Sequence, residues 1–269
     1  MPDEFPRDCF PSDESPTDPR AAARQAMRPP LPKRFYRETG AAERDGGFVL
    51  TLDGRTARTP ARHLLALPTE ALALALAAEW AAQGDTVDPA KMPLTRIANS
   101  AIDGVASDRS AVVDDLVRYA GSDLVCYRAG EPERLVAEQA RVFEPVLAFA
   151  RDRLGARFVL SEGVMHVSQP EHAVAAVRVA VGEAGCDFRL AALHVMTTLS
   201  GSVLIPLAVA AQTLSPEEAW EAAHVDERFQ ESVWGEDEDA MARRARRWED
   251  FRAAATVYRL AGSRPGAGA

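Results

Sequence analysis

The densest group of chemically capable side chains lies late in the sequence, between residues 226 and 247. Asp226 and Glu227 come first, and Trp234-Gly235-Glu236 then leads into a run of acids that ends at Asp239. Carboxylates beside a glycine and a large aromatic ring suit the docking of a partner's backbone amides or arginine, because hydrogen bonds to ionised acceptors are strong. We therefore predict a binding site formed by Glu236, Trp234, Gly235, Asp239, Asp226 and Glu227.

Other interpretations of this acidic cluster stay open. A solvated helix face explains most of the charges, since acids favour the first turn of a helix and Asp239 with Arg243 is an i,i+4 pair. Paired carboxylates can also act as general acid and base, which would make the chain an enzyme using Glu236 in a cleft between two domains. That alternative predicts a deep polar pocket with a carboxylate partly protonated near neutral pH. A pure adaptor predicts a flat patch and a stable partner.

Other kinds of site leave little trace in the sequence. No glycine-rich phosphate-binding pattern occurs between a strand and a helix. The five histidines form no pair with the spacing of zinc ligands, and Cys9, Cys126 and Cys186 form no C-x-x-C motif. We expect no catalytic residues, no metal and no cofactor.

The composition restricts the partners and the compartment. The net charge of -9, from 40 acidic and 31 basic residues, disfavours binding to nucleic acid. No apolar stretch is long enough to span a membrane. Residues 1–32 are rich in proline and acids, unlike a signal or transit peptide, and are predicted to form a disordered leader. With few cysteines, these features indicate a cytoplasmic bacterial protein.

The first structured region is expected to be a small sheet with helices docked on it. Apolar residues alternate over 48–52, and Asp53-Gly54 then favours a tight hairpin turn. A further strand is expected at Arg34–Tyr36, joined by a turn at residues 45–47. Apolar spacing predicts a helix from Thr69 towards Gly84 and a second helix over 94–102.

The chain beyond Asp103 is almost wholly helical in pattern. The exceptions are two short strands expected at 157–160 and 164–167, and Pro145, which either kinks a helix or begins a new one. Ser215-Pro216-Glu217-Glu218 has the pattern of a capping box. One apolar face is predicted for the last helix, formed by Met241, Ala245, Trp248, Phe251, Ala255 and Tyr258.

These patterns predict an α+β protein with a small β-rich N-terminal domain followed by a larger α-helical C-terminal domain. The expected divisions are a disordered leader at 1–32, the β-rich domain at 33–104, the mainly α-helical domain at 105–262 and a flexible tail at 263–269.

Six short segments occur in the order seen in the assembly chaperones for the alpha subunit of the F1 sector of ATP synthase. The chain resembles this family over about residues 33–260, through Lys33-Arg34-Phe35-Tyr36, Leu52-Asp53-Gly54-Arg55 with Thr59-Pro60, Glu79-Trp80, Met92-Pro93-Leu94-Thr95, Cys126-Tyr127-Arg128 and Trp234-Gly235-Glu236. The resemblance implies the same two-part fold, no catalytic activity, and functional importance for Glu236. Phenylalanine stands at positions 143 and 149, where the family leads us to expect tryptophan.

The mechanism that this resemblance implies is transient cover of an aggregation-prone surface. The chain would bind the free alpha subunit on the face later covered by beta, and assembly would displace it without nucleotide. We expect a monomer, because symmetric pairing of its own apolar patch would compete with the client. A eukaryotic homologue would act in the mitochondrial matrix.

Overall fold

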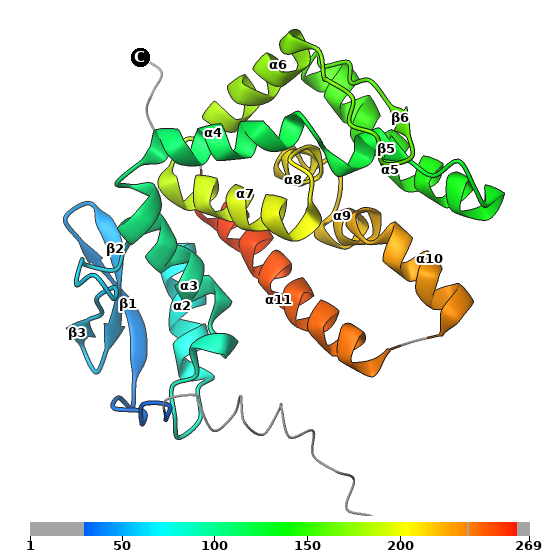
Figure 1. The fold of residues 1–269 in the computed structure, drawn as a ribbon. Helices are drawn as coiled ribbons and strands as arrows, with labels where there is room; N and C mark the ends of the chain where they lie inside the picture. Colours follow the sequence, from blue (N-terminus) through cyan, green and yellow to red (C-terminus); the bar gives the residue numbers. More distant parts are fainter. Residues whose placement is uncertain (1–29, 236, 263–269) are drawn as a thin grey trace, which may run out of the picture.

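The fold joins a small antiparallel sheet to an extended group of helices (Figure 1). The computed structural model describes residues 30–235 and 237–262. The expected tail at 263–269, Glu236 and residues 1–29 of the expected leader lie outside these ranges. The sheet followed by helices confirms the predicted α+β fold class. Apart from Val49 and Val117, the described buried apolar residues form one contact cluster through sheet and helices. The division between residues 104 and 105 stays a prediction.

Strand β2, Gly47–Leu52, is the centre of the sheet and pairs antiparallel with three other strands. These strands are β1, Thr39–Arg44, β3, Arg55–Thr56, and β4, Ala66–Leu67. The predicted strand over 48–52 and its turn are confirmed, and Asp53 and Gly54 both adopt positive φ angles, 48° and 75°.

The prediction of a strand at Arg34–Tyr36 is wrong, because the partner of β2 is Thr39–Arg44. The turn at Asp45-Gly46 pairs Arg44 with Gly47 and so draws the residues immediately before it into the sheet. The hydroxyl of Tyr36 instead donates a hydrogen bond to the backbone carbonyl of Trp80, at 2.8 Å. Segment 34–36 is thus held by the end of the next helix.

Helix α2, Glu70–Ala81, packs along the sheet (Figure 1). Its predicted start is confirmed, since the side chain of Thr69 accepts a hydrogen bond from the backbone N–H of Leu72 at 3.2 Å. The helix ends before Gly84 is reached. The second predicted helix is α3, Pro93–Ser100, which follows a short turn, η1, at Pro89–Lys91 and continues into a π-helical turn, η2, at Ala101–Val105.

The rest of the described chain is helical apart from short strands and loops. Helix α11, Glu238–Leu260, packs most extensively on α7, Asp187–Ser200, and its C-terminal half joins the helical part to α3 and α2. The other helices are α4, Arg109–Ala120, α5, Glu133–Arg153, α6, Glu171–Gly182, α8, Leu204–Ala210, α9, Pro216–Ala223, and α10, Val225–Trp234. None of the helices in the described ranges is long and apolar enough to cross a bilayer.

Local helix signals are confirmed, whereas the two strands expected late in the chain are not. Helix α5 continues through Pro145, so the alternative that this proline begins a new helix is wrong. The capping box at Ser215 forms as predicted. Of the region 157–167, only β6, Ser161–Glu162, pairs with another strand, and its partner is the parallel β5, Tyr127–Arg128. The amide side chain of Gln169 bonds the backbone N–H and carbonyl of Val159, which replaces a strand partner there.

The predicted apolar face of the last helix is covered over only half of its length. Phe251 is buried, whereas Met241 is 37% exposed and Trp248 is only half-buried. The 23 residues of α11 span about 34 Å, against about 21 Å for the 14 residues of α7. The N-terminal half of α11 therefore extends beyond the helix that covers its other half.

The fully buried carboxylate of Asp123 joins two loops far apart in the sequence. It accepts hydrogen bonds from the backbone N–H groups of Val203, at 2.8 Å, Leu204, at 3.1 Å, and Val125, at 3.2 Å. The first backbone N–H groups of a helix lack an acceptor within the helix, and Asp123 provides that acceptor at the start of α8. Burial raises the pKa of Asp123 to about 6, against the lowering effect of hydrogen bonds from Ser202 and these amides.

The contribution of Asp123 to the free energy of unfolding should fall as the pH rises through the range in which this carboxyl group ionises. Its pKa of about 6 exceeds its ordinary value of 3.8. Between these values the folded state binds more protons than the unfolded state, so stability falls with increasing pH. The stability margin of wild type over Asp123→Asn, measured by urea unfolding, should be larger at about pH 4.5 than at about pH 7.5. A margin that grows with pH would contradict this sign.

Candidate functional site

Helices α10 and α11 form an arm that projects from the helical body, here called the α10–α11 arm and comprising residues 225–235 and 237–248 (Figure 1). Trp234 is the last residue of α10 and is 85% exposed, and its neighbour Val233 is 53% exposed. Asp237 begins α11 by accepting a hydrogen bond from the backbone N–H of Asp239 at 2.9 Å. The tip of the arm thus carries an exposed aromatic ring and two carboxylates close in sequence to Glu236, which lies outside the described residues.

Gly235 ends α10 with φ 91° and ψ 170°, a conformation that is essentially restricted to glycine. We predict that Gly235→Ala destabilises the arm by about 1–3 kcal/mol. No atom lies within 4 Å of an added Cβ, so the cost arises from the backbone alone. Gly84→Ala is the matched control, because its Cβ position is equally open and its φ is not in the left-handed region. Equal hydrogen exchange of the α10 amides in the two variants would contradict the prediction.

The structure places Asp226 and Glu227 at the base of the arm, about 12 Å along α10 from Trp234. The carboxylate of Asp226 accepts a hydrogen bond from the amide of Gln139, at 2.7 Å, and this buried glutamine also accepts from the backbone N–H of Ala129 at 2.8 Å. Asp226 therefore fixes α10 to α5. The predicted site residues are split between tip and base, and their role in binding stays a prediction.

An ion pair between the two helices of the arm replaces the pair expected within α11. Asp239 and Arg243, both described, form no ion pair. Arg244 instead bonds Glu231 of α10 at 2.7 Å, and about three quarters or more of each side chain is withdrawn from solvent. This contact ties α11 to α10 below the tip.

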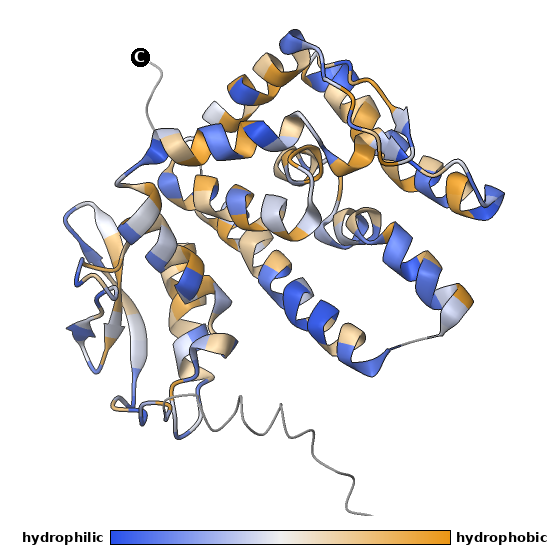
Figure 2. Ribbon diagram, in the orientation of Figure 1, coloured by the Kyte–Doolittle hydropathy of each residue, from blue (hydrophilic) through white to orange (hydrophobic). Residues whose placement is uncertain are grey.

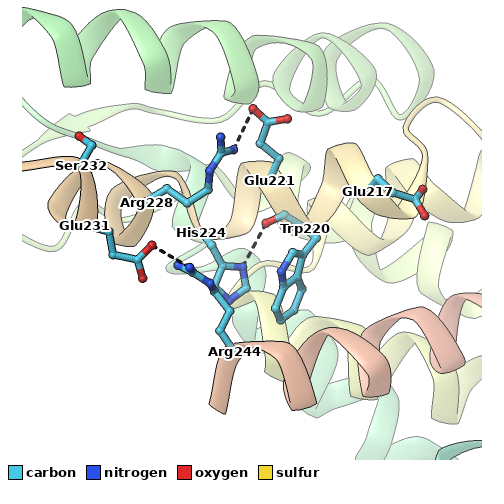
Figure 3. A pocket seen from close by; sticks show the side chains of 8 residues that line it. All are labelled: Glu217, Trp220, Glu221, His224, Arg228, Glu231, Ser232 and Arg244. Carbon is cyan, nitrogen blue, oxygen red and sulfur yellow. Dashed lines mark hydrogen bonds and ion pairs between the residues drawn. The ribbon is translucent and has the colours of Figure 1, made fainter. Parts of the chain in front are cut away.

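A polar pocket of about 530 Å³ lies between α9 and the two helices of the arm (Figure 3). Arg228 pairs with Glu221 at 2.9 Å, and Glu221 also pairs with Arg141 of α5 at 2.6 Å. The carboxylates of Glu221 and Glu231 are thus engaged by arginines of the same chain. The lining residues are Glu217, Trp220, Glu221, His224, Arg228, Glu231, Ser232 and Arg244.

His224 is buried at the base of this pocket. Its ring lies 3.8 Å from that of Trp220, and its Nδ1–H donates a hydrogen bond to the Trp220 backbone carbonyl at 3.1 Å (Figure 3). Burial lowers the pKa of His224, and the nearby Arg247 and Arg244 lower it further, against the raising effect of the Trp220 carbonyl and Glu227. The neutral ring therefore serves as a packing surface for Trp220.

A shallow apolar groove lies beside the pocket and is here called the aromatic groove. It has a volume of about 440 Å³ and is formed mainly by Trp220 of α9 and by Met241, Ala245 and Trp248 of α11. The ring centroids of Trp220 and Trp248 are 5.6 Å apart. This surface comes from the half of α11 that extends beyond α7, and it adds to the apolar surface of the arm.

The enzyme alternative gains no support from the described residues. The groove between α2, α3 and α11 contains neither Asp226, Glu227, Trp234, Gly235 nor Asp239. Burial does raise the pKa of Glu79 in this groove, but its carboxylate accepts hydrogen bonds from the backbone N–H groups of Leu94, at 2.7 Å, and Thr95, at 2.8 Å. Glu79 therefore holds the start of α3.

The aromatic groove and the ion pair between the arm helices were not predicted from the sequence. Trp220, Met241 and Trp248 have the spacing of core positions, and the spacing does not reveal where the covering helix ends. The one available signal was the run of arginines at 243–247, because so many charges indicate that this half of the helix meets solvent.

Known proteins match this chain over most of its length. A family model described as ATP12 chaperone protein matches residues 33–151. The mitochondrial protein atp12 of Schizosaccharomyces pombe is 23% identical over 227 residues, 78% of each chain. A solved protein of Agrobacterium tumefaciens, described as a candidate chaperone, gives a TM-score of 0.83 at 49% identity and 91% coverage of both chains. Atp12 from Paracoccus denitrificans gives a TM-score of 0.80 at 40% identity, covering 86% of this chain and 99% of that chain.

The fold that this chain shares with the two solved relatives, together with the matching family model, defines the class of protein as a chaperone. The chain belongs to the ATP12 chaperone family. The resemblance to assembly chaperones of the F1 sector, first indicated by the six sequence segments, is thereby confirmed. Its relatives include both a mitochondrial and a bacterial protein.

Proposed function

We propose that this protein binds the free alpha subunit of F1 ATP synthase and shields its subunit interface until the beta subunit replaces it. Membership of the ATP12 chaperone family supports assembly of F1 as the process, and the resemblance of the sequence to alpha-subunit chaperones supports the client. In this proposal the chain acts as a monomer in the bacterial cytoplasm, has no catalytic activity and needs no cofactor.

The observation that carries the proposal is the exposure of Trp234 at the tip of the α10–α11 arm. A tryptophan that is 85% exposed buries little surface in the folded chain, whereas tryptophans that become buried on binding are prominent among interface hot spots. Val233 and the aromatic groove add further apolar surface on the same arm. Such surface on a folded protein is typical of a protein-binding region.

The holding mechanism follows from mass action. An isolated ring subunit exposes an apolar interface that favours self-association, and a protein that binds this interface lowers the free concentration able to aggregate. The affinity must stay moderate because beta has to displace the holder. Contacts concentrated on one arm allow specific binding at moderate affinity, since a few buried side chains dominate the binding free energy.

In the proposed contact, Glu236 forms a charge-assisted hydrogen bond with the client beside the ring of Trp234. Gly235 gives the chain its reversal at the tip, and Asp239 adds a nearby negative charge. Glu227 is exposed at the base of α10, where it extends the acidic surface, and Asp226 keeps α10 in place through Gln139.

Glu236→Gln should reduce the amount of isolated alpha subunit that co-purifies by about tenfold or more, the typical loss for a charged hydrogen bond. Glu238→Gln is the matched control, because it removes an exposed carboxylate two positions away and should retain alpha as wild type does. Equal retention by a folded Glu236→Gln protein would overturn the role of Glu236. No retention by folded wild type would overturn the proposed function itself.

A further inference from the structure

Helix α10 presents Trp234 at its end, yet little apolar packing holds this helix in place. Val225 is the only one of its ten residues that is buried. Figure 2 shows α10 mostly in the hydrophilic colour. Helices in folded proteins are usually held by an apolar face that packs on a neighbour. The direction of α10 must therefore depend mainly on the polar contacts of its side chains.

Two of these polar contacts are ion pairs that attach α10 only weakly to the body of the protein. Glu231 pairs with Arg244, but both residues belong to the α10–α11 arm, so this pair joins its two helices without fixing either of them to the body. Arg228 pairs with Glu221 of α9 at 2.9 Å, and the arginine side chain is 52% exposed. Exposed ion pairs contribute little because water and salt screen them.

The third polar contact joins α10 to a buried residue of α5. Gln139 is only 3% exposed, and its Nε2–H donates a hydrogen bond to the carboxylate of Asp226 at 2.7 Å. Hydrogen bonds to ionised acceptors are stronger than those between neutral groups. Helix α5 also places the guanidinium of Arg134 5.7 Å from the centre of the Phe229 ring. Helix α5 is thus the platform that sets the direction of α10.

Glutamine is the side chain that fits position 139, because its two neighbours make opposite demands. The backbone N–H of Ala129 can only donate, and the amide oxygen of Gln139 accepts from it at 2.8 Å. The carboxylate of Asp226 can only accept, and the amide nitrogen donates to it. Leucine would satisfy neither neighbour, and glutamate would place a second carboxylate against Asp226.

Ala129 directly follows Cys126-Tyr127-Arg128, a segment of the family resemblance to which the proposed function gives no role. This segment is itself fixed against α5. The guanidinium of Arg128 lies 4.9 Å from the centre of the ring of the fully buried Phe143, and the backbone carbonyl of Arg128 accepts from the N–H of Gly163 at 2.9 Å. Ala129 therefore offers its N–H to Gln139 at a defined position.

The length of α10 magnifies any change at its base. Asp226 lies about 12 Å along the helix from Trp234, so a tilt of about 10° at the base moves the tip by about 2 Å. Binding groups have to be held within about 0.5 Å of their productive geometry. The position of the Trp234 ring thus depends on the bond between Gln139 and Asp226.

We propose that Gln139 is a positioning residue for client binding, which holds Asp226 and so directs α10 and the ring of Trp234 towards the alpha subunit. The inference rests on the proposed function and extends the residues on which binding depends to α5 and to segment 126–129. Gln139 is buried and does not touch the client. It acts through the tip of the α10–α11 arm.

The first test compares two buried glutamines by titrating each variant of the full-length protein into fluorescently labelled alpha subunit. Gln139→Leu should weaken binding about tenfold or more. Gln83→Leu is the matched control and should change binding less than threefold, because Gln83 is 6% exposed and likewise accepts from a backbone N–H, that of Asp88, at 2.8 Å. Melting curves of both variants report the loss of stability, which a purely structural role predicts for both. Equal affinities of the two folded variants would overturn the inference and leave the proposed function intact.

The second test asks whether Gln139 acts through the arm tip. In a Trp234→Ala background, Gln139→Leu should weaken alpha binding by less than threefold, because the ring that it positions is no longer present. A loss of about tenfold in both backgrounds would show that the two residues act independently and would overturn the inference.

The third test restores the bond with its donor and acceptor exchanged. Gln139→Glu should weaken alpha binding about tenfold or more at about pH 8, where carboxyl groups are ordinarily ionised. Adding Asp226→Asn should bring the affinity back to within threefold of wild type, because the new amide donates to the new carboxylate, whose other oxygen still accepts from Ala129. A folded double variant that binds no better than Gln139→Glu would overturn the inference. Failure of folded wild type to bind alpha would overturn both the inference and the proposed function.

Discussion

Asp123→Ala is expected to lower the free energy of unfolding by about 3–5 kcal/mol, because it leaves several buried amides without acceptors. The backbone N–H groups of Val203, Leu204 and Val125 all donate to this one carboxylate. No water can replace it easily, since Asp123 is fully buried and the neighbouring Val203 and Leu204 are buried as well. The substitution should therefore loosen the junction between the α4 end and the start of α8.

Urea unfolding monitored by circular dichroism measures this effect. Asp114→Ala on the surface of α4 is the control, because its bond to Arg178 at 2.6 Å is an exposed ion pair worth about 0–1 kcal/mol. A loss of stability for Asp123→Ala no larger than that for Asp114→Ala would show that the buried carboxylate does not hold the two loops together.

Trp234→Ala should weaken binding of the isolated alpha subunit at least thirtyfold, corresponding to about 2 kcal/mol or more for a hot-spot aromatic. The exposed ring buries little surface in the free protein, so the melting temperature should stay nearly unchanged. The effect on binding and the effect on stability are thus separated in one variant.

Phe35→Ala is the matched control for Trp234, because Phe35 is also aromatic and is 70% exposed. Titration of each variant into fluorescently labelled alpha subunit gives the two affinities. If both substitutions weaken binding alike, or neither does, the arm tip is not the anchor of the client.

Signals confined to a few residues were sufficient to predict local structure. The helix start at Thr69, the capping box at Ser215 and the turn at Asp53-Gly54 each depend on bonds or backbone angles within about four residues. The α+β class follows from the change of apolar period after β2. Contacts between residues close in sequence can thus be predicted without knowledge of the fold.

The errors arise where distant segments decide the outcome. Segment 34–36 has the composition of a strand, but the turn at 45–46 selects Thr39–Arg44 for pairing. The expected strands within 157–167 lack partners except at Ser161–Glu162, where the partner, Tyr127–Arg128, is far away in sequence. The hydrogen bonds between Asp123 and the start of α8 also join segments far apart in sequence, and no local sequence pattern predicts them.

The candidate site shows the same division between local and distant effects. Proximity in sequence grouped Asp226 with Trp234, but an α-helix holds them about 12 Å apart and Gln139 of α5 engages the aspartate. Trp220 and Trp248 join into one groove only because α9 lies beside α11. The Trp234-Gly235 break was visible in the sequence because glycine alone suits its conformation.

We propose that the protein holds free alpha subunit and releases it to beta. Size-exclusion chromatography with light scattering, on purified alpha mixed with this protein before and after addition of beta, tests it most directly. We predict a soluble complex of one alpha subunit with one copy of this protein, which dissociates when beta is added. Aggregation of alpha despite folded wild-type protein, or a complex that persists in excess beta, would contradict the claim.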